Sequence, residues 1–181
     1  MDADGYIPRI NFTTKPEQLA VMTLNRQQNR FNMFYTNPKS GVSKLILKEE
    51  NKCYVDSEWL TSIHFMESGF TYVSEQDGYS HIYLYSPTGV MQRQITKGNW
   101  DVTALLGYDE LTKTTYYESA EESPMRRAVY KIDVKGVKTK LSTKEGTNHA
   151  DFSANFAYYV NRFSNVNTPV SYTHLRAHET V

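Results

Sequence analysis

The sequence predicts an all-β fold, a partial β-propeller with about three four-stranded antiparallel blades and the start of a fourth. Fourteen Tyr and eight Phe in 181 residues favour strands, and no window of about eleven residues has the apolar spacing of an amphipathic helix. A polar turn between two aromatic-rich runs recurs in residues 25–35, 75–85 and 119–130. Tyr35 and Tyr85 are 50 positions apart, and a period of this length is typical of propeller blades.

Gly, Pro, Asn and Asp punctuation divides the chain into short strands, four to each complete unit. In chain order, the predicted strands are 19–24, 31–36 and 43–48, then 59–65, 70–74, 81–85 and 91–96, then 102–108, 114–119, 128–133 and 138–142, and finally 149–153 and 157–163. An antiparallel β-sandwich has similar strand spacing. The reuse of one polar turn between the second and third strands favours the propeller, because a sandwich has no reason to repeat a specific turn.

A single four-stranded blade cannot bury both of its faces, and stacking of neighbouring blades removes that surface from water. A few blades do not close a ring, so we expect the chain to be a piece of a larger propeller. Expressed alone, it is expected to aggregate or to fold poorly, because strand edges and blade faces would be exposed. A sharp, reversible two-state melt at monomeric size would contradict this expectation.

Charge and hydropathy exclude several classes of partner. Lys+Arg and Asp+Glu both number 20, so the net charge is zero and no broad electrostatic attraction to nucleic acid or anionic lipid is expected. No apolar run approaches the length of about 18 residues that a membrane span requires. The first residues, Met1 to Gly5, have neither the charged nor the apolar region of a signal peptide.

The residues that could carry metal or thiol chemistry are few. Cys53 is the only cysteine, which excludes an intrachain disulfide, and we interpret it as a small apolar side chain. Asp77-Gly78 is a turn without the spaced oxygens of a calcium loop. His64, His81 and His149 are well placed, and His81 is interpreted as a hydrogen-bonded residue at the start of a strand. We therefore predict no catalytic residue, no metal site and no cofactor in this chain.

The last eleven residues, 171–181, do not continue the strand pattern. His174 and His178 have the i, i+4 spacing that suits zinc on a helix, but Glu179 follows the pair instead of the first histidine. The segment resembles a translated sequencing-adapter tail. We interpret residues 171–181 as a non-native tail and residues 1–170 as the propeller region.

Residues 72–85 and 94–102 together resemble the dipeptidyl peptidase IV family of prolyl peptidases. The first segment carries Glu75-Gln76-Asp77-Gly78-Tyr79-Ser80-His81, and the second carries Thr96-Lys97-Gly98-Asn99-Trp100-Asp101-Val102. Tyr116-Tyr117 and Tyr130-Lys131-Ile132 resemble the following blade, and Tyr6-Ile7-Pro8-Arg9-Ile10 resembles the start of a blade in bacterial members. The resemblance covers about residues 2–170.

The resemblance implies an N-terminal eight-bladed propeller joined to a C-terminal α/β-hydrolase domain, in a serine exopeptidase that releases N-terminal Xaa-Pro or Xaa-Ala dipeptides. That chemistry needs a Gly-x-Ser-x-Gly elbow followed by Asp and His, and the sequence has no such elbow. Ser68-Gly69 and Ser40-Gly41 lack the strand–elbow–helix context. The catalytic residues are therefore expected beyond Val170, and the chain alone is expected to be inactive, with the propeller gating access for peptide substrates.

Family members also anchor the free amine of the substrate with two adjacent glutamates in an earlier blade. Glu121-Glu122 has this chemistry, but it lies between the second and third strands of the third unit and is interpreted as a solvated turn. Glu49-Glu50 is interpreted as an exposed strand end. Vertebrate members use an arginine near the position of Tyr54-Val55-Asp56, where this sequence has none. No substrate-binding residue is transferred from the family.

Two further implications come from the resemblance. Family members are typically exported and often dimeric, so a periplasmic or secreted location is implied and a homodimer is allowed. The alternative function is a non-enzymatic propeller that binds peptide or protein. The continuation of the gene beyond Val170 would distinguish the two, because only the peptidase requires a hydrolase domain.

Overall fold

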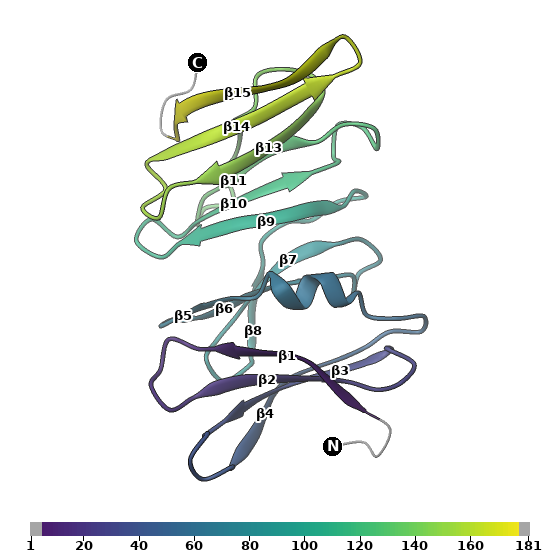
Figure 1. Ribbon diagram of the computed structural model, residues 1–181, viewed down its shortest axis with the longest axis vertical. Helices are drawn as coiled ribbons and strands as arrows, with labels where there is room; N and C mark the ends of the chain where they lie inside the picture. The colour runs from purple at the N-terminus through teal and green to yellow at the C-terminus, as the bar shows by residue number, and fades with distance from the viewer. Residues whose placement is uncertain (1–4, 178–181) are drawn as a thin grey trace. The chain divides into compact units, whose positions relative to one another are not determined.

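The computed structural model describes residues 5–177, and within them it has four antiparallel sheets (Figure 1). The first sheet has the order β1-β2-β3-β4 and the second β5-β6-β7-β8. The third has the order β9-β10-β11-β12, and the fourth has three strands in the order β13-β14-β15. The all-β prediction of four-stranded meandering blades is confirmed.

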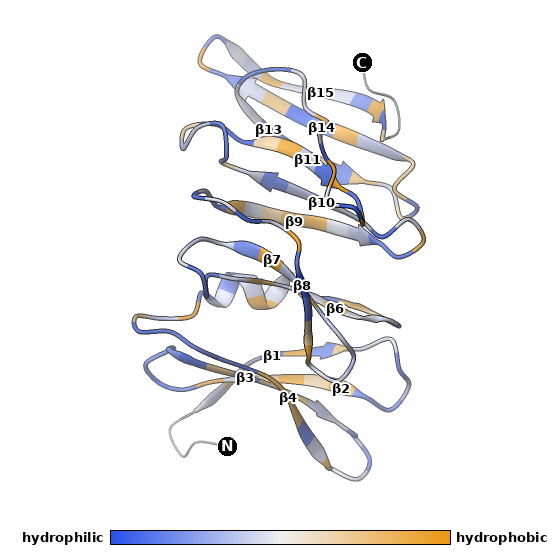
Figure 2. Ribbon diagram, turned by 180° about the vertical axis from the view of Figure 1, so that it is seen from behind, coloured by the Kyte–Doolittle hydropathy of each residue, from blue (hydrophilic) through white to orange (hydrophobic). Residues whose placement is uncertain are grey.

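Strand bounds follow the apolar and aromatic runs closely. The first two sheets contain β1 (Tyr6–Phe12), β2 (Leu19–Leu24), β3 (Arg30–Thr36), β4 (Ser43–Glu50), β5 (His64–Met66), β6 (Gly69–Ser74), β7 (His81–Tyr85) and β8 (Met91–Gln94). The last two contain β9 (Val102–Asp109), β10 (Thr114–Ser119), β11 (Ala128–Ile132), β12 (Lys138–Lys140), β13 (Thr147–Phe152), β14 (Tyr158–Asn165) and β15 (Thr168–Arg176). Hydrophobic residues dominate the buried strand β2, whereas the edge strand β8 is largely hydrophilic (Figure 2).

One predicted strand is wrong in its first half. Residues 59–65 were expected to be extended, but Ser57–Thr61 forms the 3₁₀ helix η1, and only His64–Met66 forms a strand. The Asp56 side chain accepts a hydrogen bond from Glu58 N (2.9 Å) and caps the helix. This cap satisfies a backbone donor that a strand would have paired with a neighbour, so the local turn is favoured.

The end of the chain also differs from the expected pattern. Residues 168–176 form β15, which pairs antiparallel with β14 over seven registered positions from Tyr158↔Arg176 to Asn165↔Thr168. Most β15 side chains are exposed, because backbone pairing at a sheet edge does not require an apolar face. Pairing therefore continues past Val170, where the apolar alternation stops. The assignment of residues 171–181 as a non-native tail stays a prediction.

The recurrent turn has a common backbone conformation in the first two sheets. Gly78 N donates to Glu75 O (2.9 Å) between β6 and β7, and Gln28 N donates to Asn25 O (2.9 Å) between β2 and β3. Gly78 has φ 98° and Gln28 has φ 56°, so both fourth positions lie in the left-handed region. Glycine adopts this conformation without cost, whereas Gln28 is held in it by the surrounding turn.

The chain divides into two compact units, and each has its own aromatic core. The first unit contains residues up to 78 together with 83–94, and the second contains residues 79–82 and those from 95 onward. In the first, Phe31 stacks on Tyr72 with ring centroids 5.7 Å apart, which joins the first two sheets. In the second, Tyr116 contacts Phe152 at 4.6 Å, which joins the third and fourth sheets. Face-to-face contact between successive sheets is the packing that a propeller requires.

Candidate functional site

The serines considered as nucleophiles lie in hairpin turns. Ser68-Gly69 is at the turn between β5 and β6, and Ser40-Gly41 is at the turn between β3 and β4. A Cβ on Gly69 would lie 1.9 Å from the Tyr85 carbonyl oxygen, so this glycine is required for close packing of the turn on β7. Neither site has the strand-to-helix geometry of a nucleophile elbow.

The Glu121-Glu122 pair lies in the turn after β10, and both carboxylates are neutralised by lysines of β12. Glu121 forms an ion pair with Lys138, and Glu122 Oε1 lies 2.8 Å from Lys140 Nζ. The Tyr130 hydroxyl donates to Glu122 (2.9 Å). The hydrogen bond from Lys140 holds the pKa of the Glu122 carboxyl below its ordinary value. In this structure, both carboxylates are paired with lysine ammonium groups.

The interpretation of this pair as a solvated turn holds for one residue only. The Glu122 side chain is 42% exposed, but that of Glu121 is 9% exposed. Aromatic rings explain the difference, because Lys138 Nζ lies 5.8 Å from the Trp100 ring centroid and 5.5 Å from that of Tyr130. Through its ion pair with Lys138, Glu121 therefore lies near the Trp100 and Tyr130 rings, where its carboxylate is partly shielded from water. Burial, together with the hydrogen bond to Glu122, raises the pKa of Tyr130.

Glu49 departs from the expected exposed strand end, whereas Glu50 matches it. Glu49 is half-buried and accepts a hydrogen bond from Ser74 Oγ (2.8 Å), and burial raises the pKa of its carboxyl. Glu50 is exposed and pairs with Lys48 at 2.9 Å. The two carboxylates alternate across β4, so the period of the strand places them in different environments. Tyr54 and Asp56 lie in the loop that leads to η1, outside any strand.

His81 is a fully buried, hydrogen-bonded residue at the start of β7, as its sequence context indicated. Its Nδ1 lies 3.1 Å from Thr96 Oγ1, and its Nε2 lies 2.9 Å from Gly98 O. Its ring meets the Trp100 ring edge-on, with centroids 5.0 Å apart and an interplanar angle of 90°. A carbonyl oxygen can only accept, so Nε2 carries the proton and His81 clamps the Thr96–Trp100 segment to β7.

His149 lies in a charged cluster that the sequence did not reveal. Its Nδ1 is 2.6 Å from Glu118 Oε1, and its Nε2 is 3.7 Å from Asp151 Oδ1. Arg162 Nε lies 3.3 Å from Asp151 Oδ2. Burial raises the pKa of the Glu118 carboxyl. The missed signal was Glu118 itself, a carboxylate near the end of the aromatic strand Thr114–Ser119, where burial needs a partner.

The remaining candidates for metal or thiol chemistry do not converge. Cys53 is exposed in the loop after β4. His64 lies in β5, and His174 lies in β15, a strand in which i, i+4 residues do not form a helical ligand pair. His178 and Glu179 lie outside the described residues. Among residues 5–177, no group of three or more His, Cys, Asp or Glu side chains is arranged to hold a metal ion.

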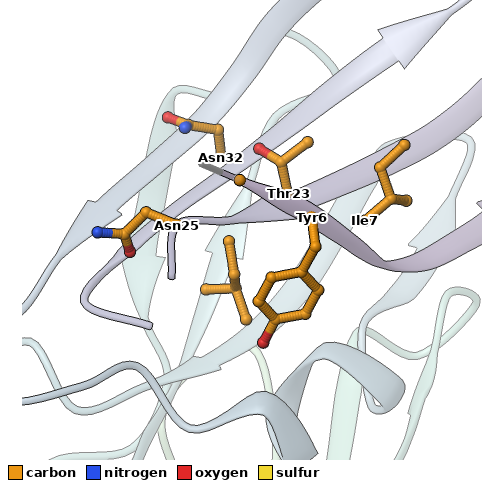
Figure 3. Close-up of a pocket in the computed structure, with 7 residues that line it drawn as sticks. Tyr6, Ile7, Thr23, Asn25 and Asn32 are labelled. Carbon is orange, nitrogen blue, oxygen red and sulfur yellow. The ribbon is translucent and has the colours of Figure 1, made fainter. Parts of the chain in front are cut away.

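The pocket shown in Figure 3 is too small for a substrate. Tyr6 and Ile7 of β1 line it together with Thr23, Asn25 and Asn32 from β2, its end and β3 (Figure 3). Its volume is about 30 Å³, enough for about two water molecules. Asn25 is already committed to the turn, since its Oδ1 accepts from the backbone N–H groups of Asn29 and Arg30.

A larger cleft of about 490 Å³ opens beside the β3–β4 and β7–β8 turns. Its walls include Tyr35, Ile46 and Pro87, and Lys15 and Lys44 lie on its exposed rim. Burial raises the pKa of Tyr35 to about 12, so this phenol stays protonated at neutral pH. The cleft has the size of a ligand site, and its lining combines apolar side chains with polar and charged ones such as Glu17, Gln18 and Asn37.

Comparisons with known proteins agree with this geometry. The family model described as "Dipeptidyl peptidase IV (DPP IV) N-terminal region" matches residues 1–170. Dipeptidyl peptidase 4 of Trichophyton rubrum is 29% identical in a 164-residue alignment that covers 84% of this chain and 21% of that protein. The chain therefore spans about a fifth of the length of this curated relative.

Two solved structures share the fold. The crystal structure of Porphyromonas gingivalis dipeptidyl peptidase 4 matches with a TM-score of 0.94 and 59% identity, over 98% of this chain and 25% of that one. A putative dipeptidyl aminopeptidase IV from Bacteroides ovatus matches with a TM-score of 0.83 and 22% identity, over 98% and 29% of the two chains, which supports the fold alone.

Proposed function

Because the chain belongs to the dipeptidyl peptidase IV N-terminal region family, we propose that it forms part of the substrate-gating propeller of a serine exopeptidase. The parent enzyme releases N-terminal Xaa-Pro or Xaa-Ala dipeptides, and its α/β-hydrolase domain lies outside this chain. The observation that carries the proposal is the family match over residues 1–170, supported by 59% identity to Porphyromonas gingivalis dipeptidyl peptidase 4 in its crystal structure.

In this proposal the chain contributes a rigid wall to the access route and supplies no reacting group. Stacked aromatic pairs such as Phe31–Tyr72 and Tyr116–Phe152 fix the sheets against their neighbours, which suits a scaffold that excludes large substrates. Glu121 and Glu122 are held by lysines, so the substrate amine is bound by other residues of the parent protein.

The proposed partners are the hydrolase domain of the same parent chain, peptide substrates and a second copy in a homodimer. A periplasmic or secreted location is proposed from the family alone. Within residues 5–177, the structure has no helix with the length and apolar character needed to cross a bilayer.

The first experiment is to sequence the source locus beyond codons 1 and 170 and to express the complete parent protein. We expect the continuation to encode a Gly-x-Ser-x-Gly elbow followed by Asp and His, and the parent protein to hydrolyse Gly-Pro-p-nitroanilide. Replacing the elbow serine with alanine is the matched control and should abolish turnover. The 181-residue chain alone should release no p-nitroaniline.

A locus that lacks a hydrolase domain would overturn the peptidase proposal. It would leave the alternative of a non-enzymatic propeller that binds peptide or protein. Hydrolysis by the chain alone would contradict the assignment of the chemistry to the remainder of the parent protein.

A further inference from the structure

The cleft of about 490 Å³ in the first unit lies among three hairpin turns. These are the turns between β1 and β2, between β3 and β4, and between β7 and β8. All of the residues that line the cleft belong to the first compact unit. Its volume falls within the range of about 300–1,000 Å³ that is typical of small-ligand sites.

Three contacts hold these turns in place without a ligand. Glu17 of the β1–β2 turn forms an ion pair with Lys39 of the β3–β4 turn. Within the β3–β4 turn, Asn37 Oδ1 accepts a hydrogen bond from Lys39 N (2.9 Å). A Cβ on Gly89 would lie 1.8 Å from the Ile46 carbonyl oxygen, so the β7–β8 turn packs closely on β4 because residue 89 is a glycine. A cleft with walls that are already positioned loses less conformational entropy when a ligand binds.

The charges around the cleft leave two lysine ammonium groups without a counter-ion. Glu17 is neutralised by its ion pair with Lys39. Lys15 and Lys44 lie on the exposed rim, and within residues 5–177 their ammonium groups form no ion pair and no hydrogen bond. The cleft therefore has a local positive charge, although the net charge of the whole chain is zero.

The rest of the lining combines apolar surface with one phenol. Ile46 and Pro87 supply apolar surface, and the Tyr35 ring packs on that of Phe65 with centroids 6.4 Å apart. The Tyr35 hydroxyl has no hydrogen-bond partner in the part of the chain that the structure describes. Burial raises the pKa of Tyr35 to about 12, so the hydroxyl keeps its proton and can donate it at neutral pH.

We propose that this cleft binds a small carboxylate that carries an apolar group. The ammonium groups of Lys15 and Lys44 attract the carboxylate, which accepts a hydrogen bond from the Tyr35 hydroxyl. The apolar group packs on Ile46 and Pro87. Inorganic phosphate fits this lining less well, because a compact hydrated anion leaves the apolar surface in contact with water. The site is independent of the peptidase proposal, since no reacting group is needed for binding.

Ligand-observed saturation-transfer NMR on the parent protein, with N-acetyl-L-phenylalanine as the probe, tests the proposal. The acetylated probe lacks the free amine of a dipeptidyl peptidase substrate. We expect a dissociation constant of about 1 mM, which is in the range for a ligand of this size. N-acetyl-L-phenylalaninamide has the same shape without the negative charge, and it should bind about tenfold more weakly.

Variants of the cleft residues locate the binding. The double variant Lys15→Gln/Lys44→Gln should weaken binding of the acid about fivefold, and Tyr35→Phe, which removes only the hydroxyl, about threefold. Neither variant should change binding of the amide by as much. Lys52→Gln is the matched control, because it removes the same charge from an exposed lysine outside the cleft and should leave binding unchanged.

Three results would overturn the proposal. The first is the absence of measurable binding of N-acetyl-L-phenylalanine to the unmodified parent protein. The second is equal affinity for the acid and the amide, which would show that the carboxylate is not recognised. The third is an equal loss of affinity in Lys52→Gln and in Lys15→Gln/Lys44→Gln, because the attraction would then come from the general charge of the surface and not from this cleft.

Discussion

Two contacts in the second unit are each built around a histidine, and they differ in what the imidazole meets. His81 meets a carbonyl and a hydroxyl, is 0% exposed and clamps the Thr96–Trp100 segment to β7. His149 meets carboxylates at the β10–β13 contact and keeps one nitrogen near solvent. The partners of a histidine, and not its presence in a strand, therefore decide whether it joins two uncharged groups or lies in a charged cluster.

The hydrogen bonds of His81 engage both ring nitrogens. Thr96 Oγ1 already accepts a hydrogen bond from Ile82 N (2.9 Å), so its hydroxyl proton is directed to His81 Nδ1. Each polar atom of this clamp therefore has one defined role. The clamp joins uncharged groups, whereas the His149 cluster contains two carboxylates and an arginine.

Removing the clamp should give the largest effect. His81→Ala would leave a cavity against Trp100 and would deprive Gly98 O and Thr96 Oγ1 of their partner, so we expect a loss of about 3–4 kcal/mol in the free energy of unfolding. Urea unfolding of the parent protein, followed by hydrogen exchange of the peptides that contain β7 and Trp100, measures this loss. His64→Ala, at an exposed position, should change it by less than about 0.5 kcal/mol. Similar losses in the two variants would show that His81 is not a clamp.

A smaller effect is expected from the turn that the clamp holds. Gly98 has φ 151°, and a Cβ there would lie 2.1 Å from Trp100 Nε1, so Gly98→Ala must displace the indole. We expect a cost of about 1–3 kcal/mol, measured by the same unfolding assay, together with a shift in Trp100 emission. Gly136→Ala is the control, because Gly136 also has positive φ (84°) but has nothing within 4 Å of the added Cβ. An unshifted Trp100 emission in Gly98→Ala would contradict the packing.

The buried Glu118 carboxyl should respond to pH with a defined sign. Burial raises the folded-state pKa of Glu118, so its contribution to stability is present below the ordinary glutamate pKa and is lost as pH rises through the raised value. Wild type and Glu118→Gln should therefore be similarly stable in acid, and wild type should lose stability relative to the variant as pH rises. Urea midpoints across this range measure the difference. A relative gain for wild type would reverse the assignment.

The smallest effect is expected at Glu122, which is half-exposed. Lys140 lowers the folded-state pKa of Glu122, so the stabilisation is present above the ordinary glutamate pKa and is lost as pH falls through the lowered value. Glu122→Gln should cost no more than about 1 kcal/mol at neutral pH, and added salt should reduce this cost. Glu67→Gln, in the exposed β5–β6 turn, is the control. A salt-independent cost above about 2 kcal/mol would mean that the pair is effectively buried.

Two predictions from the sequence pattern were wrong: the strand expected at residues 59–65 and the end of the strand pattern at Val170. In the first case a local side-chain cap, and in the second a backbone pairing at the sheet edge, determined the structure. The Asp56 cap converts Ser57–Thr61 into a 3₁₀ helix, although Trp59 and the residues after it read as a strand. Strand β15 forms by backbone pairing with β14, which apolar periodicity cannot report. Both cases depend on hydrogen bonds, whereas the sequence analysis relied mainly on hydrophobic alternation.

The sequence by itself determined the strands, the recurrent polar turn, the absence of a nucleophile elbow and the family resemblance, because these depend on local pattern and spacing. Only the tertiary structure decided the environments of Glu118 and Glu121. Glu118 meets Ala150 across 32 positions, and Lys138 reaches Glu121 across 17. The physical reason is that charge state and burial are set by side chains that stacked sheets bring together, and no local pattern specifies those partners.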